Sequence, residues 1–319
     1  MRTIAALSLA CLLADCAAMG RRAVVIYTTV AAAASPNQAV VTIDRAFLEA
    51  YRNRVTIAAT FTVDDAMRSP NPGFLDGDLH LAGRAPEIGL RLVAEIMNAS
   101  SESLAVARVN QAESTRAPLQ LTGVWRLWPE HAIGPEEQGE RVPQLSDPNP
   151  DHIFELHPVI EVAGINLLRT LRPVEDYHPG SAKKTFGIYE GADCTLKVTP
   201  TTVAFITSTW LYNDVHFLMQ LSDGPQLVAD GGRFVTASAL DLDGNLLVDS
   251  LRMVLVKDSP PERAVRALKP GARLEVWGLP RVSFAEISRR IGAAPTNPAE
   301  LKGKLPYEII VLGMYQEGK

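Results

Sequence analysis

Short segments rich in β-branched and apolar residues recur along most of the chain, and turn residues separate them. Such segments are typical of strands, and few stretches show the 3.6-residue period of a helix. The period of 90–97 fits either a strand or a helix. Many short strands with a few short helices predict a mainly β (α+β) fold of two small barrels in tandem. The expected strands are 55–63, 79–81, 119–128, 153–162, 195–198, 202–210, 215–221, 234–241, 246–256, 273–278 and 307–315.

Helix signals are few and local. Two capping boxes, Ser259 with Glu262 and Ser283 with Glu286, each place an N-cap hydroxyl three residues before a glutamate. They predict short helices, and glycines at the expected ends of these helices provide stop signals. Two further helices are expected at 44–52 and 102–112.

The two halves of the chain differ in charge. All eight lysines lie at or beyond Lys183. Residues 35–180 hold 12 Arg against 20 Asp and Glu, a net charge of −8, whereas residues 181–319 hold 16 basic against 15 acidic residues, a net charge of +1. A stretch rich in Pro, Gly and charged residues, 172–181, lies at this break. We therefore expect two domains, 40–172 and 185–319, with a linker at 173–184.

The first 34 residues resemble a targeting segment. One arginine precedes an apolar stretch of signal-peptide length at 4–13. A second version starts at Met19, with a basic pair, an apolar core at 23–30 and small residues before Ser35. Both versions predict a signal peptide or membrane anchor at 1–34, and an exported protein that is periplasmic, extracellular or lipid-anchored. Only this segment is expected to touch a membrane. An ordinary buried N-terminal helix is the alternative.

The chain has three cysteines, too few for a small fold that depends on several disulfide bonds. Leu13-Ala14-Asp15-Cys16 resembles a bacterial lipobox, which implies a lipid on Cys16, although Asp15 replaces the small residue expected there. Export would leave Cys194 alone or beside a lipidated Cys16. We expect Cys194 to be a small buried hydrophobe, with a nucleophile as the alternative.

The second half contains a helix, a Lys269-Pro270-Gly271 turn and a strand at 267–278, which together resemble part of an OB-fold barrel. The first half resembles the same barrel through its long strands, which carry 124–128 and 154–159. This pattern-level resemblance extends over most of both halves and implies two tandem OB-like barrels. OB barrels bind nucleic acids, sugars or proteins, so the resemblance does not fix the function. A fainter similarity links the first half to nuclease-type OB barrels.

Polar residues of the first half are spaced so that each set shares one face of a strand. Carboxylates with an imidazole suit a divalent cation, so the first set is a candidate metal site. An ordinary turn at Asp76 and Asp78, with a packed His80, is the structural alternative. The sets are Asp76, Asp78 and His80; Arg126, Trp128 and Glu130; and Glu155 and His157.

The second and third sets are candidates for catalysis. Glu130, Glu155 and His157 could act as metal ligands or general base, and Arg126 could stabilise charge on a phosphoryl group. Such a site would suit metal-assisted hydrolysis of a phosphodiester. The structural alternative is a cross-strand ion pair between Arg126 and a glutamate.

Two tryptophans are candidate binding residues. Trp125 and Trp128 point to opposite faces of their strand, so we expect one in the core and the other partly exposed. An exposed Trp128 could stack on a sugar or a base, whereas packing in the core or an interface is the structural alternative. In the second half, Trp277 with nearby arginines could bind single-stranded nucleic acid, although the arginines could also form a solvated face. The arginines are Arg273, Arg281, Arg289 and Arg290.

Three functions follow from these features. The first is an exported, non-enzymatic protein that binds an unknown ligand or protein of the bacterial envelope, because no P-loop, dinucleotide-binding, zinc or nucleophile-elbow motif is present. The second is a metal-dependent phosphodiesterase or nuclease that uses the first barrel, and it alone requires a cofactor, a divalent metal. The third is single-stranded nucleic-acid binding by the second barrel. Nucleic acid is an unlikely partner for the acidic first barrel, in a chain whose net charge is −5.

Overall fold

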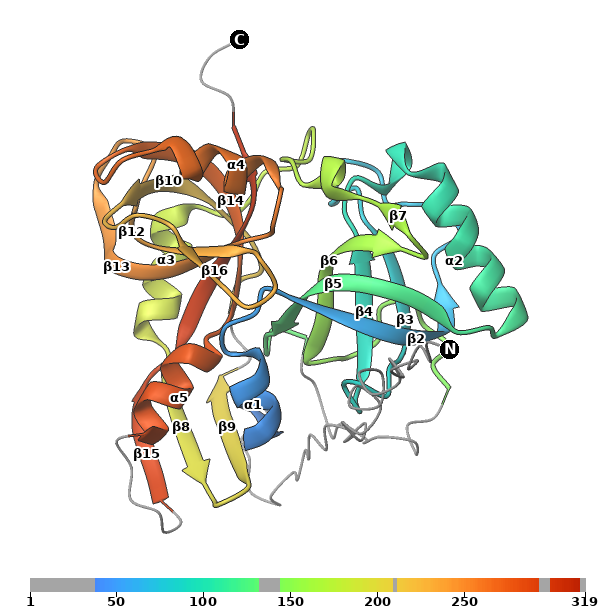
Figure 1. The fold of residues 1–319 in the computed structure, drawn as a ribbon, viewed down its shortest axis with the longest axis horizontal. Helices are drawn as coiled ribbons and strands as arrows, with labels where there is room; N and C mark the ends of the chain where they lie inside the picture. Colours follow the sequence, from blue (N-terminus) through green and yellow to red (C-terminus); the bar gives the residue numbers. More distant parts are fainter. Residues whose placement is uncertain (1–37, 132–143, 209–210, 293–298, 316–319) are drawn as a thin grey trace, which may run out of the picture.

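Two closed five-stranded barrels follow one another along the chain in the computed structural model (Figure 1), which describes residues 38–131, 144–208, 211–292 and 299–315. In the first barrel the third and fifth strands pair in parallel and close the cylinder, and helix α2 (Ser103–Thr115) lies between the third and fourth strands. Its strands, in the order β4-β3-β2-β5-β6, are β2 (Thr56–Ala66), β3 (Leu79–Arg84), β4 (Arg91–Ile96), β5 (Leu119–Leu127) and β6 (Phe154–Val162).

The second barrel repeats this connectivity. Its third and fifth strands are again parallel, and helix α4 (Pro260–Ala267) again lies between the third and fourth strands. Both barrels therefore have the expected OB-like design, and the mainly β class is confirmed. The strands, in the order β10-β14-β16-β13-β12, are β10 (Val215–Leu221), β12 (Arg233–Leu240), β13 (Leu246–Leu255), β14 (Arg273–Val282) and β16 (Tyr307–Met314).

A four-stranded sheet outside both barrels was not expected. Strands β8 and β9, which the pattern places in the second half, pair with each other here, and β9 also pairs with β1 from the start of the described chain. Helix α1 (Arg45–Tyr51) continues β1 and packs Phe47 against Phe284 of α5 (Phe284–Gly292). The first described residues thus lie beside elements of the second half. The sheet order is β1 (Gln38–Asp44), β9 (Thr202–Ser208), β8 (Asp193–Val198) and β15 (Ala299–Lys304).

Local sequence signals explain most element boundaries. The hydroxyl of Ser259 accepts a hydrogen bond from the Glu262 amide at 3.3 Å, and Ser283 caps α5 in the same way. The ambiguous segment 90–97 is strand β4. The remaining short elements are η1 (Ala99–Ser101), β7 (Ile165–Asn166), η3 (Leu168–Thr170), α3 (Ala182–Gly191) and β11 (Gln226–Leu227). Among the described residues, no helix is long and apolar enough to cross a membrane.

The two barrels pack through their outer faces. A small apolar cluster joins Val124 of the first barrel to Leu279 and Ile310 of the second. Beside it, the fully buried guanidinium of Arg281 pairs with Glu308 at 2.7 Å and donates hydrogen bonds to the carbonyls of Arg54, Val55 and Trp125. It also lies 3.6 Å from the centre of the Trp125 ring. One side chain of the second barrel thus satisfies three backbone carbonyls of the segment and strand that it faces.

We expect Arg281→Met to lower the free energy of unfolding by about 3–5 kcal/mol, because Glu308 and three carbonyls would lose a buried partner. Arg281→Lys should recover little, since an ammonium cannot replace the planar fork of donors. Urea unfolding, followed by circular dichroism, measures the free energy of unfolding of each variant. The matched control is Arg273→Met on the same strand, whose side chain is exposed. Equal losses for both variants would contradict the role given to Arg281.

Candidate functional site

The polar residues of the first half come together on the outer face of the first barrel. On β3, Leu79 and Leu81 belong to the main core, so the strand alternation turns His80 outward. The register places His80 directly opposite Glu95 on β4, and Glu155 on β6 directly opposite Arg126 on β5. Four adjacent strands therefore each supply a charged or titratable group to one face.

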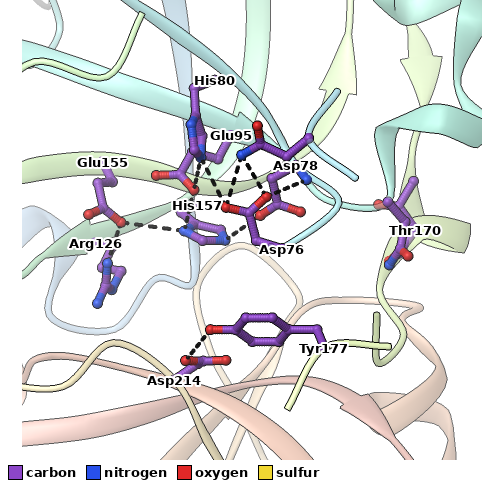
Figure 2. A network of polar contacts seen from close by, with 12 residues as sticks. Asp76, Asp78, His80, Glu95, Arg126, Glu155, His157, Thr170, Tyr177 and Asp214 are labelled. Carbon is purple, nitrogen blue, oxygen red and sulfur yellow. Dashed lines mark hydrogen bonds and ion pairs between the residues drawn. The ribbon is translucent and has the colours of Figure 1, made fainter. Parts of the chain in front are cut away.

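His157 is the centre of this cluster (Figure 2). Its Nε2 lies 3.4 Å from Asp78 Oδ2, and its Nδ1 lies 3.1 Å from Glu95 Oε2 and 3.5 Å from Glu155 Oε2. His80 Nε2 approaches the same Glu95 oxygen at 3.2 Å. Two imidazoles thus share three buried carboxylates.

Asp76 and Arg126 lie at opposite sides of the cluster (Figure 2). Asp76 accepts hydrogen bonds from Asn71 and from the backbone amide of Asp78, each at 2.9 Å, so it shapes the turn that presents Asp78. Arg126 donates to Glu155 at 2.5 Å and to the carbonyl of Pro280 at 2.8 Å. Arg126 is therefore held in a buried ion pair and does not line the cavity described next.

A cavity of about 160 Å³ opens beside the cluster. Its first wall carries the carboxylates and imidazoles of the first barrel, and its second wall carries Asn213, Asp214, Trp277 and Leu279. Among the described residues that line it, none is Lys or Arg. Asp78 Oδ1 is buried there without a hydrogen-bond partner. The cavity thus contains a carboxylate oxygen that no other described side chain satisfies.

Burial and mutual charge shift the pKa values of this cluster. Burial raises the pKa of Asp78 to about 6, against the opposing effect of His157. Burial would also raise the pKa of Glu95, but the charges of His157 and His80 lower it to about 2. Burial acts to lower the pKa of His80, yet Glu95 raises it to about 9. The neighbouring carboxylates also hold the pKa of His157 well above its usual value. These shifts favour the positively charged, doubly protonated form of both imidazoles at neutral pH.

Two sets of three side chains place their ligand atoms within 4.8 Å of one another, as metal coordination requires. One set, Glu95 with His152 and Glu155, is already closed, because Arg126 and His152 both pair with Glu155. The other set, Asp78 with Glu95 and His157, faces the cavity. All three residues of this second set line the cavity, so a further ligand could reach an ion held there.

The structure thus brings together most of the predicted site residues: Asp76, Asp78, His80, Arg126, Glu155 and His157. Glu130 lies just after β5, outside the cavity lining, and burial raises its pKa to about 7. Sequence reasoning missed Glu95, although it is the one acid in the apolar run 90–97. It also missed His152, Tyr177 and Asp214, which only the packing of loops and barrels brings to the cluster.

The other candidate residues differ in their surroundings. Trp125 and Trp128 are both buried, so the expectation that one of the two is partly exposed is wrong. Trp128 donates to the carbonyl of Tyr212, and the alternative of a packed Trp128 is the one that the structure supports. Trp277 lines the cavity. Trp277 is 5% exposed and Arg281 is fully buried, so neither lies on an open surface, whereas Arg289 is exposed and pairs with Glu286.

The cysteine predictions have separate outcomes. Cys194 is buried, and burial raises the pKa of its thiol to about 12, which removes the thiolate that a nucleophile needs. The small buried hydrophobe is therefore the reading that the structure favours. Cys16 and the rest of the export segment lie outside the described residues.

Comparison with known proteins adds no functional assignment. No family model matches the chain, and no curated protein matches it. Among solved structures, it is similar to the wild-type single-stranded DNA binding protein from Thermus aquaticus at 11% identity and a TM-score of 0.22, with 83% of this chain and 92% of that chain covered. A deletion mutant of that protein gives 10% identity, a TM-score of 0.23 and 94% coverage of its chain. Such scores transfer no function, and the barrel assignment rests on strand connectivity.

We expect the free energy of unfolding of the metal-free protein to fall as the pH rises from about 6.5 to 9. The folded pKa of His80 is about 9 against an ordinary 6.5, so its stabilising effect is complete below pH 6.5 and is lost as the pH rises through 9. His157 acts in the same direction. The raised pKa values of Asp78 and Glu130, about 6 and 7, cause a similar loss at lower pH. The expected fall is on the order of 2 kcal/mol.

Urea unfolding in EDTA across this pH range measures the effect. His80→Asn should flatten the slope, whereas His178→Asn, which changes an exposed histidine, should leave it unchanged. A wild-type stability that stays constant over the range would contradict the charged state assigned to the two imidazoles.

Proposed function

We propose that this protein is a non-enzymatic binding protein whose first barrel holds a divalent metal ion through Asp78, Glu95 and His157. The observation that carries the proposal is the unpartnered Oδ1 of Asp78, which is buried and faces the cavity. A buried polar atom without a partner costs free energy, and a bound cation would remove that cost. The ligand atoms of Asp78, Glu95 and His157 lie within 4.8 Å of one another, and a bound ion would displace the proton from the His157 nitrogen that it coordinates.

The position of the site in the barrel supports the proposal. OB-type barrels bind ligands on the face of their second and third strands, with help from the first-to-second and fourth-to-fifth strand loops. Here β3 and β4 supply His80 and Glu95, and the loop before β3 supplies Asp78. This face carries acceptors and no lining Lys or Arg among the described residues, so it suits a cation and disfavours a phosphate chain.

The donor set indicates which metals fit. Two carboxylate oxygens and one imidazole nitrogen match Zn²⁺ or Mn²⁺ better than Ca²⁺, which prefers six to eight oxygens. Three protein ligands leave at least one coordination position toward the cavity. When bound, the ion would act as a Lewis acid for whatever occupies that position.

Metal-assisted hydrolysis is the second candidate, and the three-ligand count favours it, because catalytic sites keep an open position. The residues give it less support. Arg126 is held by Glu155 and Pro280, so it is not free to contact a phosphate in the cavity. Turnover of a phosphodiester by the metal-loaded protein would make hydrolysis the leading function.

We expect Zn²⁺ or Mn²⁺, added to metal-free residues 35–319, to raise the midpoint of thermal unfolding. An ion at about 100 times its Kd stabilises by roughly 2.7 kcal/mol. Asp78→Asn and His157→Gln should each abolish the rise, while Asp243→Asn, in an exposed turn, should retain it. Metal content measured after dialysis gives a second readout if a variant is unstable. No shift with any metal would leave the cluster as a structural ion-pair network.

We also propose that the protein is exported to the bacterial envelope, on the evidence of residues 1–34 alone. Expression of the full chain with a C-terminal tag, followed by fractionation and intact mass, tests this. We expect cleavage near Ser35 or, with lipidation, a diacylglycerol-bearing Cys16. Cys16→Ala should shift the mass only in the lipidated case. A cytoplasmic protein that retains its first residues would contradict export.

A further inference from the structure

The second wall of the cavity contains a carboxylate, Asp214, that two aromatic side chains hold by hydrogen bonds. Asp214, which precedes β10, is 8% exposed and lies across the cavity from the metal-site residues (Figure 2). Its Oδ1 accepts a hydrogen bond from the Tyr177 hydroxyl and its Oδ2 one from the Trp277 indole, both at 3.0 Å. Two aromatic rings thus hold one carboxylate in a fixed orientation.

This wall still has unused acceptors. The backbone amide of Asp214 also donates to its carboxylate, which can accept about four hydrogen bonds, so one position remains beside those of Tyr177 and Trp277. The adjacent Asn213 Oδ1 is buried without a hydrogen-bond partner. Both residues line the cavity, as does Asn149. A ligand that fits here must therefore bring several donors.

The aromatic and apolar groups of the cavity narrow the choice further. The centroids of the Tyr177 and Trp277 rings lie 5.8 Å apart, and the two side chains turn their hydroxyl and indole N–H groups toward Asp214. The carboxylate of Asp214 is therefore the group that would attract a cation. Leu75 and Leu279 also line the cavity and would accept an alkyl chain. Donors, positive charge and a short apolar chain are the features of a primary alkylammonium ion.

We propose that Asp214, Asn213, Tyr177 and Trp277 form a site for a primary ammonium group on a short alkyl chain, separate from the metal ligands on the opposite wall. The N–H donors of the ammonium would pair with Asp214 and with Asn213 Oδ1, and its charge would be balanced by the Asp214 carboxylate that Tyr177 and Trp277 hold in place. A cavity of about 160 Å³ limits the ligand to a small amine. This site uses none of the three proposed metal ligands, so binding of the amine can be tested independently of binding of the metal.

The probe is n-butylammonium, with n-butanol as its neutral counterpart of similar size. Isothermal titration of residues 35–319 in EDTA should show saturable binding of the amine and none of the alcohol. We expect Asp214→Asn to weaken binding about tenfold or more, because the ligand charge would lose its partner. Asp243→Asn, which changes an exposed turn residue outside the cavity, should bind the amine within about twofold of wild type. Asp214→Asn should in turn keep the metal-induced rise in the unfolding midpoint.

A measurement on the wild-type protein avoids dependence on any variant. Nuclear Overhauser effects should connect the butyl protons to the indole of Trp277. Equal binding of butanol, or absence of these effects under saturating amine, would overturn the proposal. The proposal would also be overturned if Asp78→Asn lowered the affinity for the amine as much as Asp214→Asn, because the amine would then occupy the position proposed for the metal. Failure of metal binding with amine binding retained would overturn the proposed metal site alone.

Discussion

The buried guanidinium of Arg281 is the interaction on which the relation of the two barrels depends. It is paired with Glu308 inside its own barrel and supplies donors to three carbonyls around the start of β2 and along β5. A charge with no exposed surface is stable only where all of these partners are present. The contact therefore favours one placement of β14 against the first barrel, and that placement brings Trp277 and Leu279 over the charged face.

The position of the second barrel explains why titratable side chains on the outer face of the first barrel are buried. Four side chains of this face point away from the interior of their own barrel: His80, Glu95, Glu155 and His157. In an isolated barrel, side chains on this outer face would lie near water. The second barrel and the loops bury them, and burial makes their mutual charges strong enough to shift the pKa values by units rather than fractions. The metal proposal and the ammonium proposal use opposite walls of the cavity that this arrangement encloses.

Part of the site could be predicted from the sequence because strand alternation is local. The spacing of Asp78 with His80, and of Glu155 with His157, was enough to place each pair on one face. Glu95 was missed because the period of 90–97 did not distinguish strand from helix, so its direction was undefined. Asp214 and Tyr177 carry no local pattern, and they reach the cavity only through the packing of the second barrel and the chain that joins the barrels.

The sequence by itself determined the mainly β class, most strands and the capped starts of α4 and α5, because alternation and capping depend on residues a few positions apart. Only the tertiary structure decided that β1 pairs with β9, that Trp128 is buried and that Arg281 joins the barrels. These contacts link residues more than 80 positions apart, or depend on which surface covers which. No local period encodes such contacts, and the cavity with its two walls is their result.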